Sequence, residues 1–154
     1  MKVYLDNCSY NRPFDDQSKM RIYLETQAKL HIQKLIHEGS LALAISYVSH
    51  YENGNSPYSR NKITIEKFFE NATTFINIDR ANIIEWKANE IMKFGVKSKD
   101  ALHISCAIEV ACDYFITTDD EILKKYKTGE IKVCSPIEFI NIWEDFLCKQ
   151  QQPL

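Results

Sequence analysis

The chain has 154 residues, which fits one domain, because a chain of this length can bury roughly 70% of its unfolded surface around a single core. Hydrophobic residues make up 45% and charged residues 26% of the sequence, a balance that excludes a disordered or low-complexity protein. The formal net charge of -2 and the pI of about 6.1 exclude a global positive field that would draw the whole chain onto nucleic acid or an acidic membrane.

The N-terminal segment MKVYLDNCSY has one lysine and a short apolar run that Asp6 interrupts. It fits neither a signal peptide nor a membrane span, so we expect a cytoplasmic protein that makes no contact with a membrane. The five cysteines are an odd number without CxxC spacing, and the four histidines do not lie at zinc-ligand intervals from them. The sequence therefore predicts no zinc site and no intrachain disulfide, and Cys106 and Cys112 are interpreted as small core residues.

Short apolar runs typical of buried strands recur along the chain. They lie at 3–5, 41–45, 74–78 and 114–117, with a weaker candidate at 131–133. Between the first two runs, apolar residues from Leu24 to Ile36 recur at helical spacing, and Gly39 is expected to end that helix. Further helices are predicted at about 58–70, 80–93, 99–112, 119–126 and 137–147, with Asp79, Ser98 and Ser135-Pro136 as start signals and Gly95 and Gly129 as stops.

Strands that alternate with helices favour parallel pairing, because parallel neighbours need a long crossover connection. The predicted fold class is α/β, a three-layer α/β/α sandwich with a central parallel sheet of four to five strands. We expect one domain over residues 1–148 and a short C-terminal tail at 149–154. The turn-rich segment NGNSPYSRN at 53–61 is interpreted as a surface loop, with a mobile flap beside a site as the alternative.

Acidic residues follow the predicted strands or open the predicted helices. In a parallel sheet with crossover helices, the carboxyl ends of strands and the starts of helices meet at one edge, where ligands bind. Asp6 ends the first strand, Glu52 lies seven residues past the second, Asp100 opens a helix, and Asp119 and Asp120 follow the fourth strand. All of these acids are therefore expected at the same edge.

Each acid taken alone also has a purely structural interpretation. Asp100 lies near a helix start, and Ser49 with Glu52 and Thr118 with Glu121 have capping-box spacing. Taken together, the clustered carboxylates repel one another, and a bound cation offsets that repulsion. Oxygen ligands without cysteine or histidine suit Mg²⁺ or Mn²⁺, and such a metal suits phosphodiester hydrolysis.

Three parts of the chain resemble the PIN-domain family: VYLDNCSYNRPF at the start, Glu52, and GVKSKDALHISCAIEVACDYFITTDDEIL near the end. The family pattern has an Asp ending the first strand, an acid after the second, an Asp opening a DALH-type helix, and a T-x-D after the next strand. Four acids match these places, namely Asp6, Glu52, Asp100 and Asp119. A departure is Asn7, because family members often carry Thr or Ser at that position.

The resemblance implies a metal-dependent endoribonuclease that cuts single-stranded RNA with Mg²⁺ or Mn²⁺ and leaves a 5′-phosphate and a 3′-hydroxyl. It further implies a VapC-type toxin of a type II toxin–antitoxin pair, with a cognate antitoxin protein as partner and a homodimeric assembly. Asp6, Asp100 and Asp119 are the expected metal ligands, and Glu52 completes the shell around the metal. Ranked by how well the sequence supports each acid, Glu52 comes third, after Asp6 and Asp100. Asn7 and Asp120 are expected in the second shell, and Asp120 has a first-turn charge as its alternative.

Local cations near the acids are the candidates for RNA binding, since the chain lacks a global positive charge. Lys97 and Lys99 flank Asp100, and Arg12 follows the first strand. Solvated surface is the alternative for the lysines, and for Arg12 a turn in which it pairs with an acid. His103 is interpreted as a satisfied, partly buried histidine and not as a general base. The aromatic residues Tyr4, Trp86 and Trp143 are interpreted as core or interface.

Two other α/β enzyme classes place acids at this edge. A haloacid-dehalogenase-like phosphatase needs a second Asp two residues after the first, where this chain has Cys8, and a phospho-acceptor receiver needs adjacent acids near the first strand. The alternative from another functional class is a catalytically inactive PIN-like module that binds protein or RNA, against which the intact acids argue.

Overall fold

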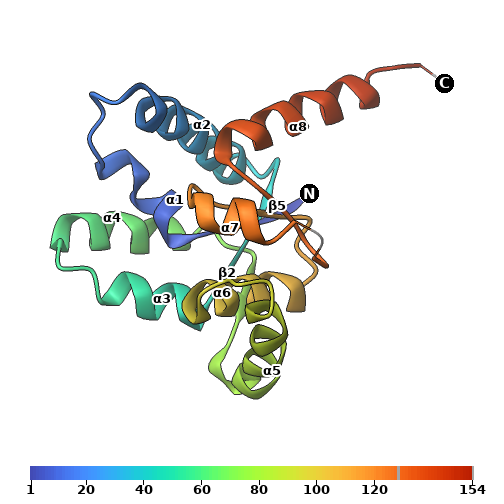
Figure 1. Cartoon of the computed structure of the whole chain (residues 1–154). Helices are drawn as coiled ribbons and strands as arrows, with labels where there is room; N and C mark the ends of the chain where they lie inside the picture. The colour runs from blue at the N-terminus through green and yellow to red at the C-terminus, as the bar shows by residue number, and fades with distance from the viewer. Residues whose placement is uncertain (128, 154) are drawn as a thin grey trace.

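The structure is a computed structural model that describes residues 1–127 and 129–153 (Figure 1). Its strands are β1 (Lys2–Leu5), β2 (Ala42–Ser46), β3 (Thr74–Ile76), β4 (Tyr114–Ile116) and β5 (Lys132–Cys134). Its α-helices are α1 (Asn7–Asn11), α2 (Met20–His37), α3 (Tyr47–Gly54), α4 (Ser59–Phe69), α5 (Ala81–Met92), α6 (Ser98–Glu109), α7 (Asp120–Lys125) and α8 (Pro136–Gln150). Two 3-10 turns, η1 (Arg12–Phe14) and η2 (Ile78–Arg80), complete the described elements.

The five strands form one parallel sheet in the order β3-β2-β1-β4-β5. At its centre, Val3 of β1 lies opposite Leu43 of β2 and Tyr114 of β4. All five predicted strands are therefore confirmed, with ends that differ from the prediction by no more than two residues. The central position of β1 means that Asp6, which follows it, lies between the ends of two neighbouring strands.

Successive side chains of β1 point to opposite faces of the sheet and enter two separate cores. Val3 and Leu5 lie in the core beneath α2, α4 and α8. Tyr4 lies in the other core, beneath α5 and α6. Helices therefore cover both faces of the sheet, as Figure 1 shows, and the predicted three-layer α/β/α sandwich is confirmed.

The helix ends show where local sequence signals succeed and where they fail. Gly39 and Gly95 follow the ends of α2 and α5 with φ of +80° and +88°, the left-handed conformation that glycine adopts without strain, so both predicted stops are confirmed. Ser135 caps α8 as predicted, in a capping box with Glu138. Ser98, in contrast, is the first residue of α6, and its N-cap is Lys97.

The sequence pattern did not predict the short helix α1 or the helix α3, and α3 is the one that carries Glu52. Its N-cap is Ser46, which forms a capping box with Ser49, so the expected box of Ser49 with Glu52 is wrong and Glu52 lies inside the helix. The predicted box of Thr118 with Glu121 is wrong too, since Asp119 caps α7. Within the turn-rich segment 53–61, only residues 55–58 lie outside helices.

The remaining structural expectations concern burial. Tyr4 and Trp143 are buried, whereas Trp86 is 64% exposed on α5, so of its two interpretations, core or interface, the core is excluded. Cys106 and Cys112 are buried, and all five cysteines are free.

The helix α8 continues to Gln150, past the predicted domain boundary. Across the described part of the chain, no helix combines the length and apolarity that a bilayer crossing requires.

We predict that truncating Ile104 destabilises the fold strongly. Ile104 of α6 is fully buried against the sheet, so Ile104→Ala should lower the free energy of unfolding by about 2 to 5 kcal/mol. For a chain of this length that corresponds to a melting temperature lower by roughly 4 to 20 °C. Thermal unfolding followed by circular dichroism measures the change.

The matched control is Ile63→Ala, which removes the same atoms from a side chain on α4 that is 68% exposed. It should leave the melting temperature nearly unchanged. Equal melting temperatures for the two variants would contradict the assignment of Ile104 to the core.

Candidate functional site

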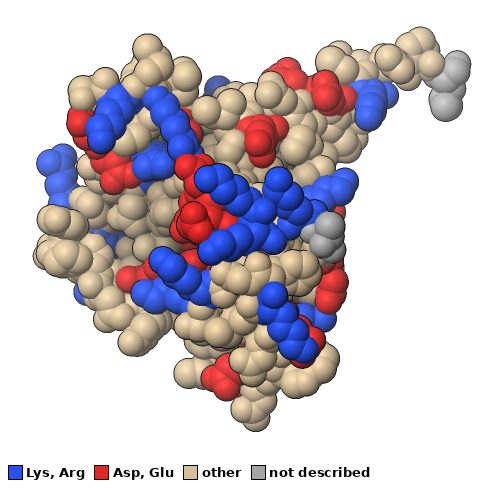
Figure 2. Space-filling model, in the orientation of Figure 1, with Lys and Arg blue, Asp and Glu red and all other residues tan. Residues whose placement is uncertain are grey.

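Four acidic residues reach one edge of the sheet, and we call them the carboxylate cluster: Asp6, Glu52, Asp100 and Asp119. Asp6 directly follows β1, and Asp119 follows β4 and caps α7. Asp100 lies in the first turn of α6, and Glu52 lies in α3, the helix after β2. Acidic side chains gather near the middle of the face in Figure 2, with lysines and arginines around them.

Asp6 is the most firmly held member of the cluster. It is 4% exposed, and its Oδ1 accepts a hydrogen bond of 2.7 Å from the backbone N–H of Asn7. Its Oδ2 accepts from the Thr117 hydroxyl at 2.9 Å and from the Cys8 thiol at 3.1 Å. The same Thr117 oxygen accepts a bond of 3.0 Å from the backbone N–H of Asp119. Thr117 therefore ties the ends of β1 and β4 together and fixes Asp6 next to the start of α7.

Cys8 contributes a neutral thiol at this position. Burial, together with the negative charge of Asp6, raises the pKa of Cys8 to about 12. The thiol is then protonated at neutral pH and serves as a donor to Asp6. The raised pKa disfavours a nucleophilic role for Cys8, because the thiolate is the reactive form.

Asp100 is the member with the least support. No hydrogen bond or ion pair joins its carboxylate to any residue within 1–127 and 129–153, although the side chain is half-buried. Burial raises the pKa of Asp100 to about 6, and the charges of Asp6, Asp119 and Glu52 add to the effect. The site therefore holds negative charge at Asp100 that the neighbouring side chains do not neutralise.

Glu52 is in the opposite situation, because donors and cations surround it. The ring Nε2 of His103 hydrogen-bonds to Glu52 Oε2, and Lys99 Nζ lies 4.0 Å from Glu52 Oε1. Burial alone would raise the pKa of Glu52, but the interaction with His103, the charge of Lys99 and the side chain of Asn7 lower it below its usual value. Glu52 is therefore ionised at neutral pH.

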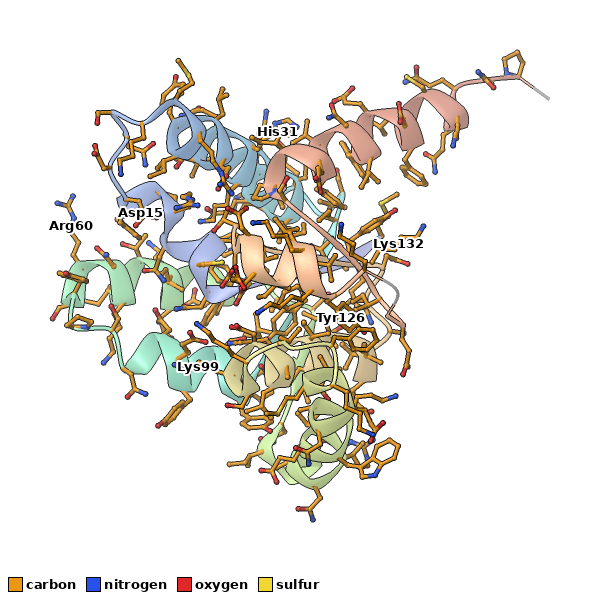
Figure 3. The ribbon with its side chains drawn as sticks, in the orientation of Figure 1. Asp15, His31, Arg60, Lys99, Tyr126 and Lys132 are labelled. Carbon is orange, nitrogen blue, oxygen red and sulfur yellow. The ribbon has the colours of Figure 1, made fainter. Side chains whose placement is uncertain are left out.

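The predicted RNA-contacting cations occupy different surroundings. Lys99 is 60% exposed and lies beside the cluster, where Figure 3 labels it. Lys97 is exposed at the start of α6. Arg12 pairs with Glu25 at 2.8 Å and with Asp15 at 3.0 Å, in line with the turn-and-acid alternative. These contacts leave Lys97 and Lys99 as the more available cations.

Asp120 and Asn7, which we expected to support the metal ligands from behind, have different hydrogen-bond partners. Asp120 receives both ends of the Arg21 guanidinium, at 2.7 and 2.8 Å, and this hydrogen-bonded pair lowers the pKa of Asp120. That bond points Asp120 toward α2 and gives it a role in holding α7 to that helix. Asn7, in contrast, lies close to two members of the cluster, because its backbone N–H donates to Asp6 and its side chain contributes to the lowered pKa of Glu52.

A groove of about 1090 Å³ begins at Glu52, Asn7 and Lys99 and runs between η1 and the turn from α3 to α4. Its walls carry the exposed aromatic rings of Phe14 and Tyr58, together with asparagine side chains and the guanidinium of Arg60 on α4 (Figure 3). A further groove of about 470 Å³, between α5 and Tyr126, contains none of the four acids. Of the carboxylate cluster, Glu52 is the member that lines the larger groove.

The donor set of the carboxylate cluster fits a hard divalent cation. All its donors are carboxylate oxygens, which Mg²⁺ and Mn²⁺ prefer, and Asp100 leaves charge that a cation would neutralise. As the side chains stand, no three His, Cys, Asp or Glu residues of the described chain meet in an arrangement that would hold a metal ion. Binding would therefore require the carboxylates to rotate inward.

The sequence located the four acids but missed two residues that hold them, Thr117 and His103. Thr117 is the threonine of the T-x-D in the family pattern, so the sequence showed its position but not its hydrogen bond to Asp6. His103 is hydrogen-bonded at both ring nitrogens, as predicted, but it is fully and not partly buried, and its partner Glu52 was not predicted.

No family model matches the chain, and no curated protein sequence matches it. Among solved structures, it is similar to a chain of "VapBC2 from Rickettsia felis bound to a DNA fragment from their promoter", with 16% identity, a TM-score of 0.54, and coverage of 88% of this chain and 98% of that one. DNA-bound VapBC from Salmonella typhimurium gives 16% identity, the same coverages and a TM-score of 0.48. The Rickettsia felis structure confirms the PIN-like α/β fold.

We predict that Asp100→Asn stabilises the protein in the absence of divalent ions. Because the pKa of Asp100 is raised in the folded chain, ionisation of this carboxyl opposes folding above its unfolded pKa of about 3.8. At pH 7.5 the variant should be more stable by about 1 kcal/mol, a figure already reduced for solvent screening of this half-buried group. The melting temperature should rise by roughly 2 to 4 °C.

The difference should depend on pH. It should be complete above pH 6, shrink between pH 6 and 4, and vanish at about pH 4, where the carboxyl is protonated in both folded and unfolded chains. Melting curves in EDTA at several pH values provide the measurement. A variant that is less stable than wild type at pH 7.5 would show that Asp100 has a stabilising partner.

Proposed function

We propose that this protein is a Mg²⁺- or Mn²⁺-dependent endoribonuclease that hydrolyses phosphodiester bonds of single-stranded RNA. The observation that carries the proposal is the unsupported carboxylate of Asp100 among the charges of Asp6, Asp119 and Glu52. Among the residues that the structure describes, no hydrogen bond or ion pair occupies the oxygens of Asp100, so both are free to bind a metal. The PIN-like fold places this cluster where α/β proteins bind substrates.

When bound, a divalent ion supplies a water of lowered pKa and offsets negative charge on the phosphoryl oxygens. Asp6, Asp100 and Asp119 would hold it, and Glu52 would complete the set. The Thr117 hydroxyl holds Asp6 at this edge of the sheet, where β1 and β4 end. Asp100 loses its electrostatic penalty on binding, which favours the ion-bound state.

The chain's own groups can also orient an RNA strand. Lys97 and Lys99 offer positive charge beside the cluster, which attracts the phosphate backbone despite the net negative charge of the chain. The adjoining groove has exposed rings of Phe14 and Tyr58, on which unpaired bases can stack. A duplex cannot expose its base faces in this way, so the groove favours a single strand.

We further propose that the protein is the toxin of a type II toxin–antitoxin pair and works in the cytoplasm as a homodimer. The sequence resemblance to VapC-type toxins and the likeness of the fold to a chain of the VapBC2 complex support the first part. An antitoxin protein would then be the cognate partner. Co-purification of the chain with the product of a neighbouring reading frame, and sedimentation of the isolated chain, test these assignments.

The activity leads to our third prediction. Purified protein should cleave mixed single-stranded RNA with Mn²⁺ or Mg²⁺ and not in EDTA. Asp6→Asn or Asp100→Asn should lower the rate at least about tenfold, because a neutral amide is a weaker ligand for a hard cation. The rate of product formation on a denaturing gel provides the measurement.

Asp113→Asn is the matched control, since Asp113 is an exposed acid whose Oδ2 accepts a hydrogen bond from the backbone N–H of Lys2 at the other end of the sheet. It should cleave at the wild-type rate. Full activity in both Asp6→Asn and Asp100→Asn, with circular dichroism unchanged, would remove the basis for the site. A wild-type protein that binds RNA without cleaving it would favour the inactive PIN-like module.

A fourth prediction concerns stability. An ion that binds only the folded site must stabilise the fold, so Mn²⁺ at about ten times its dissociation constant should add roughly 1.4 kcal/mol. The melting temperature should then rise by about 3 to 6 °C. Asp6→Asn should lose most of that rise. A wild-type melting temperature indifferent to millimolar Mn²⁺, at constant ionic strength, would contradict metal binding.

A further inference from the structure

A buried chain of hydrogen bonds ends at Glu52, and we call it the Tyr4–His103 network. The hydroxyl of Tyr4 lies 2.7 Å from Ser46 Oγ, 2.9 Å from Ser49 Oγ and 2.7 Å from His103 Nδ1. The other ring nitrogen of His103 bonds to Glu52. Tyr4 and Ser46 are 0%, His103 1% and Ser49 4% exposed, so water does not compete for these bonds.

The direction of donation along the network follows from its acceptor end. A carboxylate oxygen can only accept, so in the bond between His103 Nε2 and Glu52 Oε2 the ring nitrogen carries the proton and donates. In a neutral ring Nδ1 then accepts from the Tyr4 hydroxyl, and the Tyr4 oxygen accepts from Ser46 or Ser49. Each donor in the Tyr4–His103 network therefore meets an acceptor: the Tyr4 hydroxyl donates to His103, and His103 donates to Glu52.

The network also joins the elements that carry the cluster. Tyr4 lies two residues before Asp6 on β1, and Ser49 lies three residues before Glu52 in α3. His103 lies three residues after Asp100, one turn further along α6. The ring of Tyr4 stacks on Phe115 of β4, the strand that leads to Asp119. A single buried tyrosine thus contacts all the elements from which the four acids project.

We propose that His103, held by Tyr4, is a positioning residue that orients the Glu52 carboxylate toward the metal of the proposed nuclease site. This inference rests on the proposed function. His103 holds Oε2 of Glu52 through one directed bond, so Oε1, which lies 4.0 Å from Lys99 Nζ, is the oxygen left for a metal. Groups that hold a metal-binding carboxylate through its second oxygen commonly change metal affinity about 10- to 100-fold when removed.

The test compares the Mn²⁺ dissociation constants of wild type and variants by isothermal titration calorimetry, with no RNA present. His103→Leu removes the donor to Glu52, and His103→Gln restores a side-chain N–H near the position of Nε2. Tyr4→Phe leaves the bond to Glu52 but removes the donor that fixes the ring, and it serves if His103→Leu fails to fold. Ser105→Ala is the matched control, since it deletes a buried hydrogen bond of 2.7 Å from α6 to the Ile84 carbonyl, away from the cluster.

The inference predicts that His103→Leu weakens Mn²⁺ binding at least about tenfold and Tyr4→Phe about threefold or more, while His103→Gln binds within about threefold of wild type. Ser105→Ala should lose stability without a change in the dissociation constant. Equal constants for wild type, His103→Leu and Tyr4→Phe would overturn the positioning role and leave the metal site intact. Equal weakening by Ser105→Ala would overturn it too, because it would mark a general effect of stability. A wild-type protein that binds no Mn²⁺ would overturn the proposed function itself.

Discussion

The crowding of four carboxylates at one edge of the sheet is the constraint on which the rest of the site depends. It follows from the topology, because parallel strands place all their carboxyl ends, and the starts of the crossover helices, on the same side. Like charges in a half-buried place repel one another, and the protein must offset that repulsion to fold. The groups that offset the negative charge of each acid therefore indicate the role of that acid.

Three acids are compensated by the protein itself. Asp6 has donors from Asn7, Cys8 and Thr117, and Asp119 accepts from the backbone N–H of Glu121 at the start of α7. Glu52 has His103 and Lys99. Asp100 has none of these among the residues that the structure describes, and its pKa rises accordingly. Asp100 lacks a neighbouring positive charge, and the groups around it are carboxylates. A divalent cation, which prefers oxygen ligands, would supply that charge.

The sequence predicted the layered fold because the three central strands β1, β2 and β4 are short apolar runs that are largely buried. Most helices also show apolar periodicity, although the longest, α2, buries Glu25 and Lys29 and exposes Leu24. It also predicted the edge on which the acids lie, since that follows from parallel topology alone. The helix α3 was missed because its segment YVSHYENG has few apolar residues and is fixed by tertiary contacts. The bonds from Thr117 to Asp6 and from His103 to Glu52 span 111 and 51 residues, and no local pattern encodes such contacts.

The central claim is that the carboxylate cluster binds a divalent metal, and crystals soaked in Mn²⁺ test it most directly. Manganese scatters anomalously, so an anomalous difference map locates the ion without reference to any assumed chemistry. The account predicts one or two peaks with carboxylate oxygens of Asp6 and Asp100 at about 2.0 to 2.3 Å, the range of hard-cation ligands. A fully occupied Mn²⁺ elsewhere on the protein, with no peak between Asp6 and Asp100, would contradict it.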